Sequence, residues 1–96
     1  MPRPLLSDAE IADGLRGTAW QREGEEIATE VKLADFREAM AFVNEVATEA
    51  ERLNHHPDIT IKWNRVGLRV STHDSGGLTA LDLELARAID AHRPGV

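Results

Sequence analysis

The chain has 96 residues, a formal net charge of −6 and no cysteine. Its length predicts one domain over residues 1–96, and the excess of 17 acidic over 11 basic residues argues against nucleic acid and anionic membrane surfaces as partners. The lack of cysteine excludes disulfides and thiolate metal sites, and no apolar run is long enough for a membrane span. Residues 1–10 lack the apolar core of a signal peptide, so we expect a cytoplasmic protein.

The first third of the chain predicts a short helix and a hairpin. Ser7 and Glu10 form a capping-box pattern that predicts a helix over residues 8–15. Residues 19–33 then contain a turn signal at Gly24, followed by alternating apolar and polar side chains. The acidic run around this turn is expected to be solvated.

A long amphipathic helix is predicted within residues 33–53. It must end before Pro57, because the residue preceding a proline avoids the α region. Glu51 then lies on the last turn, with His55 and His56 at or just beyond the end of the helix. Apolar side chains recur every three or four residues and are expected to face the core: Leu33, Phe36, Met40, Val43, Ala47 and Ala50.

A second hairpin is predicted over residues 58–72, where apolar and polar residues alternate. Asn64-Arg65 is the expected turn. Trp63 is expected in the core, on the inner face of the first strand with Ile59 and Ile61. The inner face of the second strand is expected to carry Val66, Leu68 and Val70.

A last helix is predicted within residues 76–92, capped near Thr79. The order is then α-β-β-α-β-β-α. Strands arranged in hairpins predict an α+β fold, with a two-layer, four-stranded antiparallel sheet and helices packed on one face. The other face of the sheet should be more polar, and its edge strands are candidates for pairing between subunits.

Three of the four histidines are predicted to meet. His55 and His56 precede the first strand of the second hairpin, His73 follows its partner, and an antiparallel strand begins beside the end of its neighbour. Glu51 precedes His55 by one helical turn, and Asp82 lies on the first turns of the last helix. A carboxylate beside a histidine orients the ring and favours its charged form, as acid–base catalysis requires.

Simpler interpretations of these residues remain open. A histidine at a helix end often only interacts with the helix dipole. A zinc site is less favoured, because adjacent histidines on a kinked loop seldom face one ion and the helical ligand pairs of known zinc motifs are absent. His92 is predicted to be solvated near the C-terminus. Trp20 is either core or an aromatic wall for a flat ring.

From about residue 5 to residue 92, the sequence resembles the pterin-4a-carbinolamine dehydratases, also called 4a-hydroxytetrahydrobiopterin dehydratases. The family motif has an acidic residue, three residues, His, His or Asn, and Pro. An aromatic residue follows after five or six residues, then a His or Trp, and finally an Asp. Every position and gap is met here, by Glu51, His55, His56, Pro57, Trp63, His73 and Asp82.

The resemblance implies a four-stranded antiparallel sheet with helices on one face, in dimers or tetramers. It implies a pterin substrate, the 4a-hydroxytetrahydropterin left by an aromatic amino acid hydroxylase such as phenylalanine hydroxylase. The products would be quinonoid dihydropterin and water, and no metal, nucleotide or redox cofactor is required.

The resemblance also implies roles for individual residues. His55 and His73 would be the acid–base pair, and His56 would orient the pterin or assist proton transfer. Glu51 and Asp82 would polarise the histidines or hold the ring. Backbone groups expected to bind the pterin edge are those of Pro57, Thr72, His73, Asp74 and Ser75.

Two other functions stay open at this stage. Some animal members of the family bind the dimerisation helix of a transcription factor through their tetramer surface, so one alternative is a non-catalytic binding scaffold. The other is a pterin enzyme of molybdopterin metabolism, which would keep the same pocket. A scaffold would tolerate the loss of all three histidines, whereas neighbouring genes would separate the two pathways.

Overall fold

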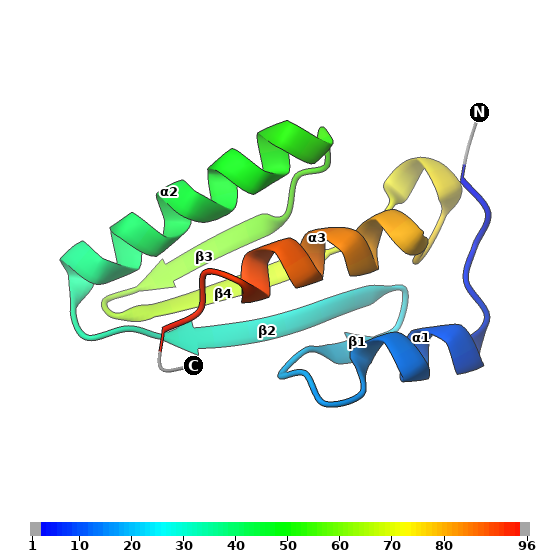
Figure 1. Ribbon diagram of the computed structural model, residues 1–96, viewed down its shortest axis with the longest axis horizontal. Helices are drawn as coiled ribbons and strands as arrows, with labels where there is room; N and C mark the ends of the chain where they lie inside the picture. Colours follow the sequence, from blue (N-terminus) through cyan, green and yellow to red (C-terminus); the bar gives the residue numbers. More distant parts are fainter. Residues whose placement is uncertain (1–2, 95–96) are drawn as a thin grey trace.

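The structure is a computed structural model that describes residues 3–94. Its elements appear in the predicted order, which confirms the α+β assignment (Figure 1). They are α1 (Asp8–Leu15), β1 (Gln21–Glu23), β2 (Glu26–Lys32), α2 (Phe36–Leu53), β3 (Asp58–Lys62), β4 (Arg65–Val70), a 3-10 turn (His73–Ser75) and α3 (Ala80–Asp90).

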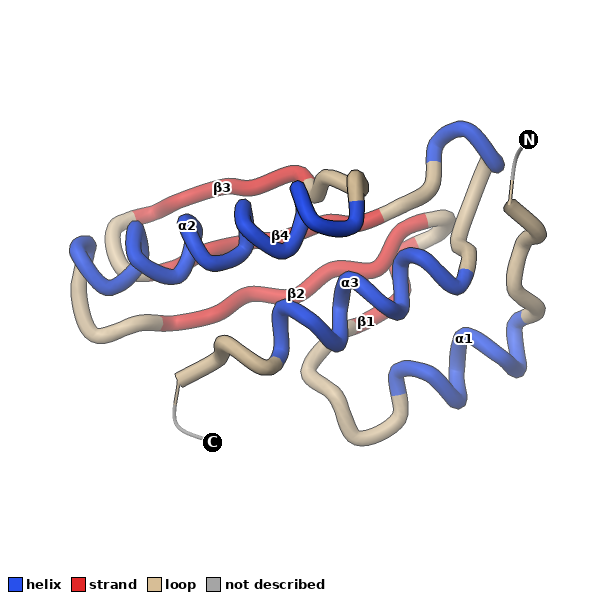
Figure 2. The backbone as a smooth tube through the Cα atoms, turned by 45° about the horizontal axis from the view of Figure 1, so that its top comes forward, coloured by secondary structure: helices blue, strands red, loops and turns tan. Residues whose placement is uncertain are grey.

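The four strands form one antiparallel sheet in the order β1-β2-β4-β3. The two hairpins meet through β2 and β4, where Ile27 lies opposite Val70 and Val31 opposite Val66. This pairing makes β4 a central strand and leaves β1 and β3 at the edges. The helices lie on one side of the sheet, as Figure 2 shows.

The core lies between this face of the sheet and helices α2 and α3. Each fully buried aliphatic or aromatic side chain there stabilises the fold by about 1.5–3 kcal/mol relative to exposure. Trp20 is part of this core, and its indole N–H donates to Asp90 at 2.8 Å. The sheet contributes Ile27, Val31, Val66, Leu68 and Val70, and the two helices contribute Ala39, Phe42, Val46, Leu85, Ala86 and Ile89.

The stripe buried by α2 differs in part from the predicted one, because Met40 and Val43 are only half-buried. Ala50 is buried as expected, but Ala47 is exposed and the side chain of Phe36 is 52% exposed. The buried positions are instead Ala39, Phe42, Val46 and Ala50. Both stripes have helical spacing, and the position of the sheet under α2 decides between them.

The prediction for Trp63 was wrong. Its side chain is 65% exposed, and its backbone has a left-handed φ of +51°. Lys62 pairs with Arg65, so the turn consists of Trp63 and Asn64 and lies one residue earlier than predicted. The strand alternation therefore ends at Lys62. Asn64 is the buried residue of the turn, and its amide donates to the Leu33 carbonyl at 3.0 Å.

His92 is not a freely solvated residue either. Its Nδ1 lies 2.7 Å from Glu45 and its Nε2 lies 2.8 Å from Glu49, both on α2. The hydrogen bond to Glu49, helped by the one to Glu45, raises the pKa of His92 despite partial burial. The residue therefore joins the end of α3 to α2, a contact that depends on how the two helices pack.

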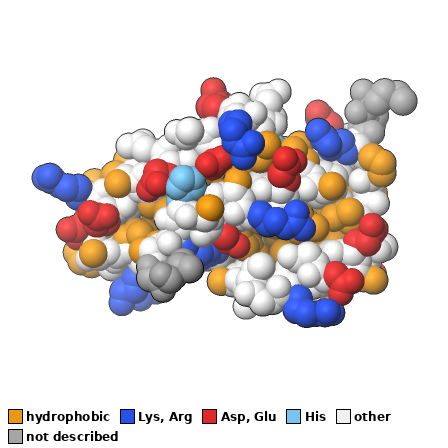
Figure 3. All heavy atoms as spheres, viewed as in Figure 1, with side chains coloured by type: hydrophobic (Ala, Val, Ile, Leu, Met, Phe, Trp, Pro, Cys, Tyr) orange, Lys and Arg blue, Asp and Glu red, His pale blue; other side chains and the backbone are white. Residues whose placement is uncertain are grey.

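Charged side chains of both signs are interspersed on the face seen in Figure 3. None of the helices within residues 3–94 combines the length and the apolar character needed to cross a membrane.

Candidate functional site

The C-terminal end of α2 determines where two of the histidines point. Asn54 has a left-handed φ of +50°, and its N–H bonds to the carbonyls of Ala50 and Glu51. The N–H of His55 also reaches back to the Ala50 carbonyl at 3.0 Å, as in a Schellman-type helix end. The chain therefore turns sharply after Leu53, before β3 begins.

His55 is held by a buried carboxylate. Its Nε2 lies 2.6 Å from Oδ1 of Asp82, and the His55 side chain is only 11% exposed. Asp82 is completely buried, and its Oδ2 accepts hydrogen bonds from the Thr72 hydroxyl at 2.7 Å and the Thr79 N–H at 2.8 Å. These donors compensate the cost of removing a carboxylate from water.

His56 has a separate, exposed partner. Its Nε2 lies 2.5 Å from Oε2 of Glu51, and both side chains are more than half exposed. Glu51 precedes His55 by four residues and would share a helical face with it only if the helix continued. The helix does not continue that far, because the left-handed Asn54 ends it before the i,i+4 geometry can reach His55.

His73 follows the second strand of the hairpin, as predicted. It is the first residue of the 3-10 turn that follows β4. Gly76 ends this turn with a φ of +80°, and its N–H bonds to the His73 carbonyl. Figure 1 shows this turn and the C-terminal end of α2 at the same end of the molecule. Together they line a pocket of about 230 Å³ formed by Asn54, His55, His56, Ser71, Thr72, His73 and Asp74.

The remaining predicted residues lie around this pocket. Pro57 and Ser75 are half-buried next to lining residues, and the Ser75 hydroxyl accepts the Arg3 N–H at 2.8 Å. Glu51 and Asp82 are not among the lining residues, but each bonds to a histidine that lines the pocket. Sequence reasoning missed Asn54 and Ser71, although an Asn between a helix and the HHP segment is a recognisable left-handed cap signal.

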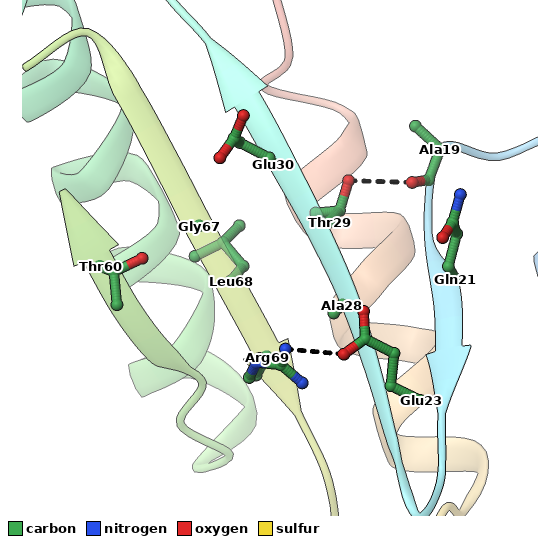
Figure 4. A pocket seen from close by; sticks show the side chains of 10 residues that line it. All are labelled: Ala19, Gln21, Glu23, Ala28, Thr29, Glu30, Thr60, Gly67, Leu68 and Arg69. Atoms are coloured by element: carbon green, nitrogen blue, oxygen red, sulfur yellow. Dashed lines mark hydrogen bonds and ion pairs between the residues drawn. The ribbon is translucent and has the colours of Figure 1, made fainter. Parts of the chain in front are cut away.

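A larger hollow of about 440 Å³ lies on the open face of the sheet, away from the helices (Figure 4). Arg69 bonds there to Glu23 at 2.7 Å, which raises the pKa of its guanidinium, and Glu26 adds a weaker contact. No histidine lines this hollow. A reaction that needs proton transfer near neutral pH is therefore better served by the histidine pocket.

The same pocket shows no sign of a metal centre. Across residues 3–94, no three His, Asp or Glu side chains are arranged to share a metal ion. The carboxylate of Asp82 bonds to His55, and that of Glu51 bonds to His56.

The fold and the pocket define an α+β protein with a histidine–carboxylate site at one end of its sheet. A family model described as "Pterin 4 alpha carbinolamine dehydratase" matches residues 4–92. The chain belongs to this family, which confirms the resemblance seen in the sequence.

Bacterial relatives cover nearly the whole chain. A protein of Roseiflexus castenholzii is 52% identical over 87 residues, which are 90% of this chain and 94% of that protein. One of Nocardia farcinica is 48% identical over 91 residues, covering 94% and 96%. Both are named as pterin-4-alpha-carbinolamine dehydratases, and both names mark the activity as unproven.

Two solved structures share the fold. One, from Brucella melitensis, is described as a transcriptional coactivator/pterin dehydratase. It is 34% identical, with a TM-score of 0.89 and coverage of 94% of this chain and 99% of that one. The other is a pterin dehydratase-like protein identified as a RuBisCO assembly factor of the α-carboxysome. Its TM-score of 0.70 at 17% identity, over 83% and 95% of the chains, shows the fold alone.

Proposed function

We propose that this protein dehydrates 4a-hydroxytetrahydropterins to quinonoid dihydropterins and water by histidine acid–base catalysis. Through this reaction it would recycle the pterin cofactor of aromatic amino acid hydroxylases such as phenylalanine hydroxylase. The observation that carries the proposal is the meeting of His55, His56 and His73 in one pocket, in a chain of this family.

The reaction needs two proton transfers. One proton goes to the 4a-hydroxyl, which leaves as water when its bond to C4a breaks. The proton on N5 is removed as the C4a–N5 double bond forms. Imidazoles titrate near neutrality and suit both steps, and each positioned group contributes about 10²- to 10⁴-fold.

The geometry supports different roles for the three histidines. His55 precedes the first strand of the hairpin and His73 follows the second, so they line the pocket from two separate segments, and we assign them the acid–base pair. His56 orients the pterin or assists the transfer. Asp82 and Glu51 hold the rings of His55 and His56.

The walls of the pocket would hold the pterin ring. A small open pocket of about 230 Å³ suits a flat bicyclic ring better than a nucleotide. We assign contacts with the pterin edge to the backbone groups at Pro57, Thr72, His73, Asp74 and Ser75.

Decay of a 4a-hydroxytetrahydropterin, generated in situ by phenylalanine hydroxylase, tests the proposal. Because carbinolamines dehydrate unaided, the rate must be compared with and without the protein. We expect acceleration by the wild type and a loss of about 10²-fold or more in His55→Ala and in His73→Ala.

The matched control is His92→Ala, which removes a histidine outside the pocket and should keep the activity. Circular dichroism should show intact folds. Wild-type turnover in either pocket variant would refute the acid–base assignment, and no acceleration by the wild type would refute the dehydratase.

A second role as a binding scaffold is favoured by one observation, the coactivator description of the Brucella melitensis relative. Binding of that kind would use the helical surface rather than the histidines. A variant lacking all three pocket histidines would lose dehydration and keep such binding.

We further propose that the protein is cytoplasmic and forms a homodimer or homotetramer. The supporting feature for assembly is β3, an edge strand with Ile61 and Trp63 exposed at its end.

A further inference from the structure

Asp82 is a completely buried carboxyl group with three hydrogen-bond partners. Its Oδ1 faces Nε2 of His55, and its Oδ2 accepts from the Thr72 hydroxyl and the Thr79 N–H. It also belongs to the capping box of α3, in which Thr79 is the N-cap residue. One carboxylate therefore fixes both a histidine and the start of a helix.

The direction of each hydrogen bond around Asp82 follows from the chemistry of its partners. An ionised carboxylate only accepts, so the single hydroxyl hydrogen of Thr72 points to Oδ2. The Thr72 and Thr79 hydroxyls also lie 2.9 Å apart, and this contact must use the hydrogen of Thr79. A chain of donation runs from Thr79 to Thr72 to Asp82, and each bond polarises the next.

The same reasoning places the hydrogen in the contact between His55 and Asp82. Oδ1 of the carboxylate can only accept, so at 2.6 Å the hydrogen belongs to Nε2 of the imidazole. Nδ1 is then the nitrogen that can exchange a proton. Within residues 3–94, the His55 side chain has no hydrogen-bond partner other than Asp82.

His56 and His73 lack such a clamp. Glu51, the partner of His56, is 77% exposed, and its bond to His56 is the only side-chain hydrogen bond it makes within the described chain. His73 is exposed. Of the three pocket histidines, His55 is therefore the one whose ring is held in a single orientation.

Thr72 also connects the two arms of the pocket. It immediately precedes His73, and its backbone bridges to Gly77 across the 3-10 turn. Its hydroxyl simultaneously reaches Asp82 behind His55. A change at Thr72 is therefore transmitted to both proposed members of the acid–base pair.

We propose that Thr72 and Thr79 are positioning residues which, through Asp82, hold His55 as its Nε2–H tautomer and make Nδ1 the proton-transferring atom. This inference rests on the proposed dehydratase function and assigns the reactive atom within it.

The first test needs no turnover. ¹⁵N NMR of the full chain, recorded at a pH where His55 is neutral, distinguishes the two imidazole tautomers. We expect Nε2–H in the wild type and in Thr79→Ser, and a mixture of tautomers in Thr72→Val and Thr79→Val. An Nδ1–H tautomer of His55 in the wild type overturns the proposal, even if every valine variant fails to fold.

The second test is kinetic. In Thr72→Val and Thr79→Val, kcat should fall about tenfold or more, the pH profile should shift and KM should change little, because the ring of His55 is misplaced while the pocket remains. Thr79→Ser should restore kcat. Thr48→Val, on the exposed side of α2, is the matched control and should behave like the wild type.

Unchanged kcat and pH profile in both valine variants would overturn the positioning role. A wild type that shows the Nε2–H tautomer but no dehydration would instead refute the proposed function and leave the tautomer assignment standing.

Discussion

His92 illustrates how one residue can link two helices by its protonation state. Both of its ring nitrogens face carboxylates, those of Glu45 and Glu49. Because carboxylates only accept, both nitrogens must carry hydrogens, and the ring must be positively charged to make both bonds. The two bonds that link α2 to the end of α3 are therefore present together only while His92 is protonated.

This link predicts a pH-dependent stability. The raised pKa of His92 means that its contribution is complete below the ordinary value of 6.5 and is lost as the pH rises through the raised pKa. The pKa of Glu49 is lowered by hydrogen bonds to His92 and Arg52, so its contribution is complete above 4.5 and is lost as the pH falls through the lowered pKa. His92→Gln should therefore destabilise the fold most between pH 4.5 and pH 6.5, where both contributions are complete.

Urea unfolding of wild type and His92→Gln at about pH 5.5 and about pH 9 measures this effect. We expect a small loss of stability at the lower pH and convergence at the higher pH, because surface ion pairs are individually weak. The same difference at both values would contradict a protonation-dependent link.

The pocket histidines were predictable because antiparallel hairpins are symmetric in sequence about their turn. His55, His56 and His73 meet for that reason, even though the turn lies one residue earlier than predicted. Which carboxylate would meet which histidine was not predictable, because the pairing depends on one left-handed residue, Asn54. The contacts of His92 depend on helix packing, about which a local pattern says nothing.

Among the elements, the end of α2 is the one that shapes the pocket. Asn54 is exposed and has a left-handed φ of +50°, a conformation that glycine and asparagine adopt at lower cost than other residues. Asn54→Ala should cost about 1 kcal/mol of stability and reduce turnover by displacing His55 and His56.

Asn54→Gly is the matched control for this helix end. It keeps the left-handed backbone accessible, so stability and turnover should stay near the wild type. Urea unfolding and the dehydration assay give both readouts. If the alanine and glycine variants behaved alike, the backbone conformation of Asn54 would not be what orients the histidines.

Local signals placed most elements well. The capping boxes at Ser7 and Thr79 are present, and α1 spans the predicted residues. The buried face of α2 was misassigned because two stripes with helical spacing coexist on it, and only the location of the sheet selects one. Trp63 was misassigned because the alternation of apolar and polar residues was extended from the strand into the turn. In a turn this alternation no longer determines which face of the sheet a side chain occupies.

At the scale of the whole molecule, the sheet order was not deducible from the two hairpins. Which strands join the hairpins depends on non-local pairing, and here β2 meets β4 over six residue pairs. That choice leaves β3 as an edge, with a free side along Asp58–Lys62 within the described chain. Unpaired edges of this kind are common sites of association.

The sequence of β3 is complementary to itself in one antiparallel register. If two copies pair about a two-fold axis at Thr60, Asp58 of each lies opposite Lys62 of the other, and Ile59 lies opposite Ile61. Both charged residues are exposed in the single chain. Pairing of β3 edges would therefore join opposite charges and cover partly exposed isoleucines, in accord with the homodimer or homotetramer proposed above.

Reversing one charge should weaken this assembly. Lys62→Glu places a second carboxylate opposite Asp58, and like charges directly opposite destabilise a strand pair. We expect light scattering to show a shift toward monomer as the protein is diluted. The double variant Asp58→Lys/Lys62→Asp restores opposite charges in the same register and should recover the wild-type mass. An assembly unaffected by Lys62→Glu would place the subunit interface on another surface, with the helical face as the next to test.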